Sequence, residues 1–275
     1  MGRLEGRVAL ITGAARGQGR SHALRLAAEG ADVILVDRCE DIESVPYSLA
    51  TPDELNETAR YVEKEGRRAI TARVDVRNSK ALSSAVDEAV AELGRLDVVA
   101  ANAGILSLHA ATQLDDIAWD DVIGVNLTGV WNTCKAAVGH VIEGGRGGAF
   151  ILTSSTSGVK GSANLAHYTA AKHGVVGLMK VLAKELSTYG IRVNTVHPTI
   201  VDTPMMRHDD IYRLFRPDLQ DPTLDDALVA YTNHNQLDVP WLDPVDVSNA
   251  LVFLASDEGR YITGLQMLID AGQTL

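Results

Sequence analysis

Short apolar runs alternate with longer amphipathic stretches along the whole chain, and this alternation constrains the fold more than any other feature. Runs that are apolar throughout are typical of strands buried on both faces, as in parallel sheets. The intervening stretches are long enough for crossover helices, which would cover both faces of the sheet. The sequence therefore predicts an α/β fold with a doubly wound parallel sheet of about seven strands. The candidate strands are Val8–Ile11, Ala31–Val36, Ala69–Val74, Leu96–Ala101, Ala149–Leu152, Arg192–Val196 and Gln266–Ile269.

The 275 residues are expected to form one domain, 1–275, because no flexible linker, repeat or low-complexity tract interrupts them. No apolar run reaches the roughly 18 residues that a membrane helix needs. The net charge of −11 argues against nucleic acid or an anionic membrane as the main partner. Cys39 and Cys134 are too few for a disulfide framework, so a reducing cytoplasm is the expected location.

A glycine-rich turn follows the first apolar run and leads into a helical stretch. Its glycines permit a tight turn and a close approach of backbone to a pyrophosphate at the helix N-terminus. Glycine also ends strands for purely structural reasons, so the elements around the turn must decide whether it binds phosphate. A glycine-rich turn between a strand and a helix is typical of a Rossmann-type dinucleotide site. The residues assigned to the cofactor are Gly13, Arg16, Gly17, Gln18 and Gly19.

Asp37 lies at the end of the second predicted strand, about twenty residues beyond the turn, where an acid can accept both hydroxyls of an adenosine ribose. Its charge would repel a 2′-phosphate, so NAD is favoured over NADP. In the alternative, Asp37 caps a turn and Arg38 binds a 2′-phosphate. Asp75 and Val76, after the third strand, are candidates for contact with adenine, although a strand-end turn explains them nearly as well.

Tyr168 and Lys172 are four residues apart and would share one face of a helix. A nearby ammonium stabilises phenolate, so Lys172 is expected to lower the pKa of Tyr168 from its ordinary value of about 10 toward neutrality. Tyr168 would then be a usable proton-transfer group. The alternative is a solvated helix face without chemistry, which this spacing alone usually indicates.

Several separated motifs together resemble the short-chain dehydrogenase/reductase family along almost the whole chain. The chain is also similar to the carveol-dehydrogenase-like, mycofactocin-associated branch of that family, on the residues from Gly13 to His22, on His197-Pro198-Thr199 and on an extra segment after the second strand. The family motifs are Thr12 to Gly19, Asn102-Ala103-Gly104, Asn126, Ser155, Tyr168 with Lys172, and Pro198.

The resemblance implies a role for each catalytic residue. Tyr168 would be the acid/base that takes the hydroxyl proton, and Lys172 would hold the cofactor ribose and favour the phenolate. Ser155, thirteen residues before Tyr168, would hydrogen-bond the substrate oxygen. Ser154 is its rival, and the family spacing favours Ser155. Asn126 would lie in the middle of a long helix and hold a water that links Lys172 to solvent; the alternative is a helix-packing amide.

The resemblance also places two loops beside the cofactor. Asn102, Ala103 and Gly104 would support the carboxyl edge of the sheet, with a mobile loop as the alternative. Pro198, Ile200 and Thr203 belong to the second loop, in which Ile200 and Thr203 would contact the nicotinamide carboxamide. Thr199 stands where the family usually has glycine and restricts the backbone there.

Two stretches look inserted relative to a minimal family member. The first, residues 39–53, contains Pro46 and Pro52 and is too broken for a helix. It would fold over the adenosine end and slow cofactor exchange, and a solvent-facing loop is about equally compatible with the sequence. Cys39 within it is expected to be inert, because it has no nearby cysteine partner.

The second stretch, residues 204–244, is the expected substrate lid. Its flexible methionines and aromatic residues could enclose a hydrophobic alcohol or ketone, although ordinary packing or a subunit contact explains most of them equally well. His208, His234 and Asp209-Asp210 have no compelling ligand spacing, so no metal site is predicted. The apolar candidates are Met205, Met206, Leu214, Phe215, Tyr231 and Trp241.

The combined prediction is an NAD-dependent short-chain alcohol dehydrogenase that interconverts a hydrophobic secondary alcohol, including a cyclic or terpenoid one, and its ketone. One alternative is an NADPH-dependent carbonyl or 3-oxoacyl reductase, and another is a non-catalytic NAD-binding sensor. The resemblance further implies a homotetramer. If NAD is retained, a separate redox partner is needed to reoxidise it.

Overall fold

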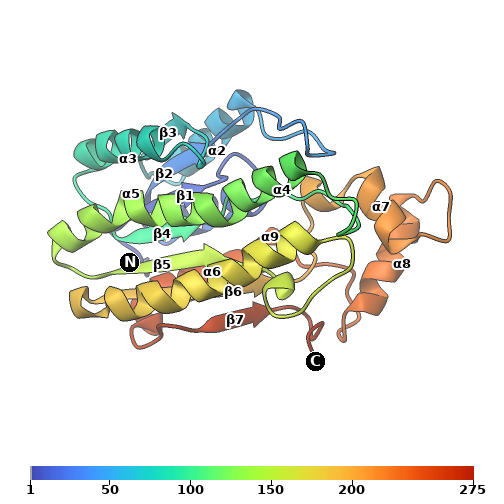
Figure 1. Cartoon of the computed structure of the whole chain (residues 1–275). Helices are drawn as coiled ribbons and strands as arrows, with labels where there is room; N and C mark the ends of the chain where they lie inside the picture. The colour runs from blue at the N-terminus through green and yellow to red at the C-terminus, as the bar shows by residue number, and fades with distance from the viewer. Residues whose placement is uncertain (1) are drawn as a thin grey trace.

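The computed structural model describes residues 2–275, which build one seven-stranded parallel sheet in the order β3-β2-β1-β4-β5-β6-β7 (Figure 1). The predicted doubly wound sheet is therefore confirmed. Each end of each candidate strand lies within two residues of the observed end. The strands are β1 Val8–Thr12, β2 Asp32–Asp37, β3 Ala69–Arg73, β4 Val98–Ala101, β5 Gly148–Thr153, β6 Ile191–Pro198 and β7 Gln266–Ile269.

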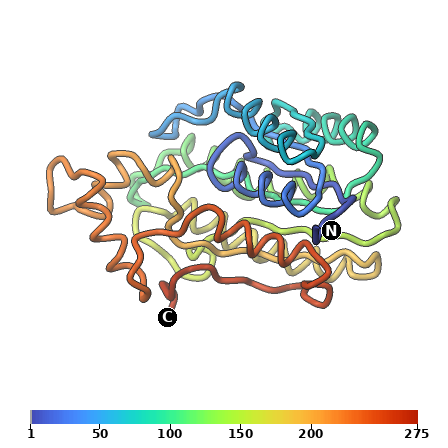
Figure 2. The backbone as a smooth tube through the Cα atoms, turned by 180° about the vertical axis from the view of Figure 1, so that it is seen from behind, coloured from blue at the N-terminus to red at the C-terminus, as the bar shows by residue number. Residues whose placement is uncertain are grey.

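Helices cover both faces of this sheet. On one face α3, α5 and α6 pack against the strands, and on the other face α1, α2 and α9 do so. The views from opposite sides in Figure 1 and Figure 2 show the two layers, with α7 and α8 at one end of the molecule. The bounds are α1 Gly17–Ala28, α2 Pro52–Lys64, α3 Ser79–Leu93, α4 Asp116–Ile123, α5 Gly129–Gly144, α6 Ala166–Glu185, α7 Asp209–Phe215, α8 Leu224–His234 and α9 Pro244–Ala255. In residues 2–275, no helix has the length and apolar character that a membrane crossing requires.

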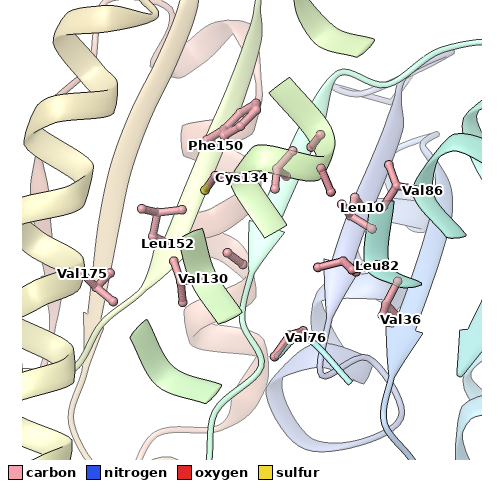
Figure 3. Packing of buried hydrophobic residues seen from close by; sticks show 14 of the residues in the cluster. Leu10, Val36, Val76, Leu82, Val86, Val130, Cys134, Phe150, Leu152 and Val175 are labelled. Atoms are coloured by element: carbon pink, nitrogen blue, oxygen red, sulfur yellow. The ribbon is translucent and has the colours of Figure 1, made fainter. Parts of the chain in front are cut away.

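The central strands are buried along their whole length, as their apolar sequences require. All five residues of β1 and all four of β4 are buried. Figure 3 shows how Leu10 of β1 and Phe150 of β5 meet Leu82 of α3 and Cys134 of α5 in the core below one face. Burial raises the pKa of the Cys134 thiol to about 12, so this cysteine packs as a small apolar residue.

The segment from 39 to 51 lies outside helices and strands, as predicted. The expectation that the stretch 39–53 is too broken for a helix is wrong at its end, because α2 begins at Pro52; the insertion itself stays a prediction. Thr51 caps this helix: its hydroxyl accepts a hydrogen bond from the backbone of Glu54, and the Glu54 carboxylate accepts one from the backbone N–H of Thr51. Proline suits the first helical position because that position needs no N–H donor.

Candidate active site

A cavity of about 830 Å³ opens at the carboxyl ends of the strands, where the strand order reverses between β1 and β4. Ligands bind at this switch point in open α/β sheets. The structure brings all but one of the predicted site residues to the wall of this cavity; the exception is Asn126. The predicted residues that line it are Gly13, Arg16, Gly17, Gln18, Gly19, Asp37, Arg38, Asp75, Val76, Asn102, Ala103, Gly104, Ser155, Tyr168, Lys172, Pro198, Ile200 and Thr203.

The glycine-rich turn has no room for larger residues. Gly13 has a φ of +67°, and a Cβ there would lie 2.9 Å from the Cα of Ala103. A Cβ on Gly19 would lie 1.9 Å from the carbonyl oxygen of Gly13. Glycine is thus required both by the left-handed backbone and by the close approach of helix α1 to the turn.

The N-terminus of α1 faces the cavity with its first N–H groups uncapped by any side chain of the described residues. Gln18, in the first turn, lines the cavity, and its buried Oε1 has no hydrogen-bond partner within residues 2–275. Uncapped N–H groups and the positive end of the helix dipole are what a pyrophosphate requires. The turn therefore fits the phosphate portion of a dinucleotide.

Asp37 lies at the end of β2 and is oriented by two backbone donors. Its carboxylate accepts from the N–H of Ala15 at 3.0 Å and from the N–H of Cys39 at 3.1 Å. Burial raises its pKa despite these bonds. A carboxylate has about four acceptor sites, so lone pairs remain for two ribose hydroxyls. The position fits NAD.

Arg38 and Asp75 are paired with each other, at 2.8 Å between Nη1 and Oδ2. Arg77 also binds Asp75, again at 2.8 Å, and this ionic environment lowers the pKa of Asp75 against the opposing effect of burial. The Arg38 guanidinium therefore already has a carboxylate partner, which disfavours the alternative in which it binds a 2′-phosphate. The contact of Asp75 and Val76 with adenine stays a prediction.

Tyr168 and Lys172 lie one turn apart on α6, with Lys172 Nζ 5.5 Å from the centre of the phenol ring. Lys172 Nζ donates to the carbonyl oxygen of Thr153 at 2.8 Å. Burial lowers the pKa of Lys172 to about 8, which weakens its hold on a proton. The pair therefore lies at the cavity wall and is not a solvated helix face.

The predicted lowering of the Tyr168 pKa is wrong for this structure. Burial raises the pKa of Tyr168, and only Ser155 acts in the opposite direction. The reason is physical: removing the phenolate from water outweighs the hydrogen bond from Ser155, and Lys172 is itself desolvated and engaged with the carbonyl of Thr153. The sequence showed the pair but not the burial of both groups.

Ser154 and Ser155 have different surroundings. The Ser154 hydroxyl is buried and donates to the carbonyl oxygen of Lys172 at 3.0 Å, which ties β5 to α6. Ser155 lines the cavity, and its Oγ accepts from the N–H of Ser157 at 3.1 Å. The Ser155 hydroxyl also lowers the pKa of Tyr168 by a hydrogen bond, so the two groups lie together at the cavity. The geometry thus favours Ser155 over Ser154 as the substrate-facing hydroxyl.

Asn126 lies midway along a helical segment from Asp116 to Gly144, within a π-helical turn at Gly124–Thr128. Its amide contacts one residue twice: Oδ1 accepts from the N–H of Ile105 and Nδ2 donates to the carbonyl of Ile105, both at 2.8 Å. The side chain fixes the loop beside Gly104. Its role in a water relay to Lys172 stays a prediction.

The loop from Asn102 to Gly104 is fixed, contrary to the mobile alternative. Thr12 Oγ1 accepts from the N–H of Asn102 at 3.1 Å and from the N–H of Ala103 at 3.2 Å. Asn102 Nδ2 donates to the carbonyl of Thr12 at 3.0 Å. These bonds hold the carboxyl ends of β1 and β4 together under the cavity.

Residues 40–50 close one side of the cavity, and Tyr47 is the aromatic residue of this segment that lines it. The Tyr47 hydroxyl accepts from the N–H of Leu106 at 3.2 Å, and its ring stacks on His208 with centroids 4.9 Å apart. Arg16 in the glycine-rich turn donates to the carbonyl of Ser48. The segment therefore contacts both the turn and the beginning of the region from 204 to 244.

That region forms an apolar wall over the carboxyl ends of β5 and β6. Tyr231 of α8 is fully buried behind this wall and donates to the carbonyl of Met206 at 3.1 Å. Thr199, which replaces the usual glycine, contacts Asn235 at 3.3 Å between Oγ1 and Oδ1 and so connects β6 with the end of α8. The wall residues that line the cavity include Met205, Met206, Ile211, Leu214 and Phe215.

Among the residues that sequence reasoning did not assign to the site are Tyr47, which lines the cavity, and His197, which adjoins Ser155. Tyr47 is an aromatic residue in an otherwise broken segment, a signal that could have marked it as buried by something outside the segment. His197 precedes Pro198 and contacts the carbonyl of Ser155 at 2.8 Å through Nδ1. Only the fold brings these two residues to the site.

Comparisons with known proteins agree with this geometry. Residues 7–211 match the model of the short chain dehydrogenase family. The (-)-trans-carveol dehydrogenase of Rhodococcus erythropolis is 55% identical over 276 residues, which cover 100% of each chain. A 3-alpha-(or 20-beta)-hydroxysteroid dehydrogenase of Mycobacterium bovis is 37% identical, over 98% of this chain and 90% of its own. The crystal structure of carveol dehydrogenase from Mycobacterium avium in complex with NAD superposes with a TM-score of 0.98 at 53% identity, over 99% of both chains.

Proposed function

Because the chain belongs to the short-chain dehydrogenase family, we propose that it is an NAD-dependent alcohol dehydrogenase that interconverts a hydrophobic secondary alcohol and its ketone. The family and the fold predicted from the sequence are confirmed. One observation carries the proposal. A single cavity is lined by the glycine-rich turn with Asp37, by Ser155, Tyr168 and Lys172, and by an apolar wall.

NAD, when bound, supplies the hydride acceptor at the C4 carbon of its nicotinamide. Tyr168 takes the proton of the alcohol, and Ser155 donates a hydrogen bond to the same oxygen. Lys172, whose Nζ lies 5.5 Å from the centre of the phenol ring, passes a proton onward. Its pKa of about 8 lies close to neutrality, where both of its protonation states are populated. The raised pKa of Tyr168 favours the phenol, so the residue also serves as the acid in ketone reduction.

The substrate class follows from the wall of the cavity and from the relatives. Methionine and aromatic side chains from 205 to 215 offer an adaptable apolar surface to a ring. The relatives act, by name, on carveol and on hydroxysteroids, both cyclic secondary alcohols. We infer a cyclic, carveol-like alcohol as the substrate.

The test is oxidation of trans-carveol by the intact protein, with ketone formation measured by gas chromatography. Tyr168→Phe should lower kcat by roughly 100- to 10,000-fold while NAD binding persists. Tyr189→Phe, at an exposed site in the turn after α6, is the matched control and should turn over normally. Unchanged turnover in Tyr168→Phe would contradict the proposed acid/base. Tight NAD binding without turnover on a broad panel of alcohols would favour the sensor, and preference for NADPH would favour the carbonyl or 3-oxoacyl reductase.

We further infer that NAD is released slowly, as the resemblance to the mycofactocin-associated branch implies. The segment from 40 to 50 is a cover whose Tyr47 contacts Leu106 and His208 on the far side of the cavity. Protein purified without added nucleotide should then contain stoichiometric NAD by mass spectrometry. Tyr47→Ala should exchange labelled NAD at least about tenfold faster, because a hydrogen bond and a stacked ring are lost. Tyr61→Ala on the outer helix α2 is the control.

A retained cofactor needs a separate redox partner for reoxidation. Turnover should then require an added electron acceptor, such as a dichlorophenolindophenol dye, and free NAD should not replace it. Stimulation by free NAD to the same rate would show an exchanging cofactor.

The proposal includes a homotetramer in a reducing cytoplasm. Trp131 of α5 and Val181 of α6 are exposed, and so are Leu265 and Leu268 at the open edge of β7. Exposed apolar residues on packed helices and on a sheet edge favour self-association. Both cysteines are free and buried, as suits a reducing compartment. Light scattering during size-exclusion chromatography should give four times the monomer mass. Trp131→Glu should lower the mass of the assembly.

A further inference from the structure

His197 is the last residue before Pro198 at the end of β6, and it is completely buried beside Ser155. Its Nδ1 lies 2.8 Å from the carbonyl oxygen of Ser155, and its Nε2 lies 2.8 Å from Thr195 Oγ1. Both ring nitrogens are therefore engaged. The imidazole connects the centre of β6 with the loop that carries Ser155.

The two contacts define one tautomer. A carbonyl oxygen can only accept, so Nδ1 carries the hydrogen and Nε2 accepts from the Thr195 hydroxyl. The contact of Thr195 Oγ1 with the carbonyl of Leu265 is longer, at 3.3 Å. Burial, reinforced by the charges of Lys172 and His173, lowers the pKa of His197 and keeps the ring neutral. The ring is thus a fixed donor toward Ser155.

The peptide of Ser155 is held from two sides. Its carbonyl accepts from His197 and also from the N–H of Gly158 at 2.8 Å. Its Oγ accepts from the N–H of Ser157, and its hydroxyl lowers the pKa of Tyr168 by a hydrogen bond, so the side chain faces the phenol. A displacement of a catalytic group by about 1 Å can cost roughly 100-fold in rate, so such restraint has kinetic value.

We propose that His197 is a positioning residue for Ser155: its Nδ1–H holds the Ser155 carbonyl so that the hydroxyl meets the reacting oxygen of the substrate. This inference rests on the proposed function, in which Ser155 contacts that oxygen. Ser155 itself touches the substrate, and His197 acts only through it. The bonds from Ser157 and Gly158 are local, and the N–H of Ser154 ties the preceding residue to the Val196 carbonyl of β6 at 2.9 Å. His197 adds the contact between β6 and the carbonyl of Ser155 itself.

Two amide variants separate the two contacts of the ring. In His197→Asn the amide nitrogen can occupy the place of Nδ1 and keep a donor toward Ser155. In His197→Gln the amide reaches the place of Nε2 and keeps the contact with Thr195 instead. We expect His197→Gln to lower kcat roughly 10- to 100-fold with little change in KM or in NAD binding. His197→Asn should be at least about tenfold more active than His197→Gln.

The double variant decides whether the effect runs through Ser155. Residues that act as a unit are not additive, so His197→Gln should cost less than about threefold in a Ser155→Ala background. A full additional loss there, or equal activities of the Asn and Gln variants, would overturn the inference. Thermal melting verifies that each variant is folded. Normal turnover in Ser155→Ala would contradict the proposed function. Impaired turnover in Ser155→Ala together with normal turnover in His197→Gln would contradict this inference alone.

Discussion

The glycine-rich turn and the apolar wall from 204 to 244 meet at the same cavity but are built on different principles. In the turn the backbone itself forms the site: a Cβ on Gly19 would lie 1.9 Å from the carbonyl oxygen of Gly13. In the wall the side chains form the site, with the Phe215 ring set edge-on against Tyr231 at 4.6 Å between centroids. The first arrangement permits only glycine at Gly13 and Gly19, whereas the second permits many apolar combinations.

This difference explains why the turn suits the phosphates of the cofactor and the wall suits an apolar substrate. A phosphate-binding turn must present N–H groups at fixed positions, and its tolerance to substitution is small. An alcohol-binding wall needs volume and apolar surface, which the flexible methionines supply. We therefore expect substitutions in the turn to affect cofactor binding and stability, and substitutions in the wall to affect substrate choice.

The largest expected effect is that of Gly19→Ala. The added methyl group cannot fit beside the Gly13 carbonyl unless α1 moves, which removes the N–H groups from the phosphate position. We expect Gly19→Ala purified without added nucleotide to contain no NAD detectable by mass spectrometry, and NAD added afterwards not to bind. Gly177→Ala is the matched control, because a Cβ at this exposed position of α6 meets nothing within 4 Å. Normal NAD affinity in Gly19→Ala would show that the turn tolerates side chains as the wall does.

Helix α1, which follows the glycine-rich turn, also makes a packing contact that depends on pH. His22 of α1 is completely buried and contacts Ser248 of α9 at 2.8 Å through Nδ1. Burial lowers its pKa from 6.5 to about 4. The unfolded chain therefore binds a proton first, and stability is lost as the pH falls from 6.5 toward 4. The loss approaches roughly 3 kcal/mol.

Urea unfolding between pH 7.5 and 4.5 measures this loss. His22→Asn keeps a polar group toward Ser248 and should remove that part of the pH dependence, whereas His173→Asn on the exposed face of α6 should leave it intact. An unchanged pH profile in His22→Asn would show that other buried histidines carry the effect.

The difference between a site built by local backbone and a site built by distant side chains also decides what could be predicted from the sequence. The glycine-rich turn and the strands were predictable because each follows from local rules. Helix α3, Ser79–Leu93, follows such a rule too, because it ends at Gly94 in the left-handed conformation that glycine favours. The contribution of Tyr47 was not predictable, since its partners Leu106 and His208 are distant in sequence. Local patterns describe the backbone, and burial depends on the assembled fold.

The pKa of Tyr168 illustrates the same limit at the catalytic centre. The spacing to Lys172 correctly suggested one helix face, and the two groups do lie together. The direction of the shift depends on desolvation of both groups, which no spacing encodes. His197 is a second example of this limit, because its contact with Ser155 joins residues 42 positions apart.

A smaller effect is expected at the boundary between the two regions, from Asp37→Ala. The substitution removes the acceptor for the ribose hydroxyls and the charge that repels a 2′-phosphate. The ratio of NAD to NADP bound by refolded, cofactor-free protein that is offered both nucleotides, measured by mass spectrometry, should fall roughly 10- to 100-fold. Arg38→Ala is the companion variant, and it should change this ratio little because Arg38 already pairs with Asp75. A ratio unchanged in Asp37→Ala would separate Asp37 from cofactor selection.

The smallest expected effect belongs to the wall, from Phe215→Leu. Leucine keeps the apolar surface but loses the edge contacts with Tyr231 and His234, whose ring centroids lie 4.6 and 5.7 Å from that of Phe215. We expect kcat/KM for trans-carveol to change by about tenfold or less relative to that for the smaller cyclohexanol. NAD affinity should stay unchanged, since the wall residue is distant from the glycine-rich turn in the chain and acts through shape alone. A loss of NAD binding in Phe215→Leu would mean that the wall and the turn form one cooperative unit, and the division between a backbone-built and a side-chain-built region would no longer hold.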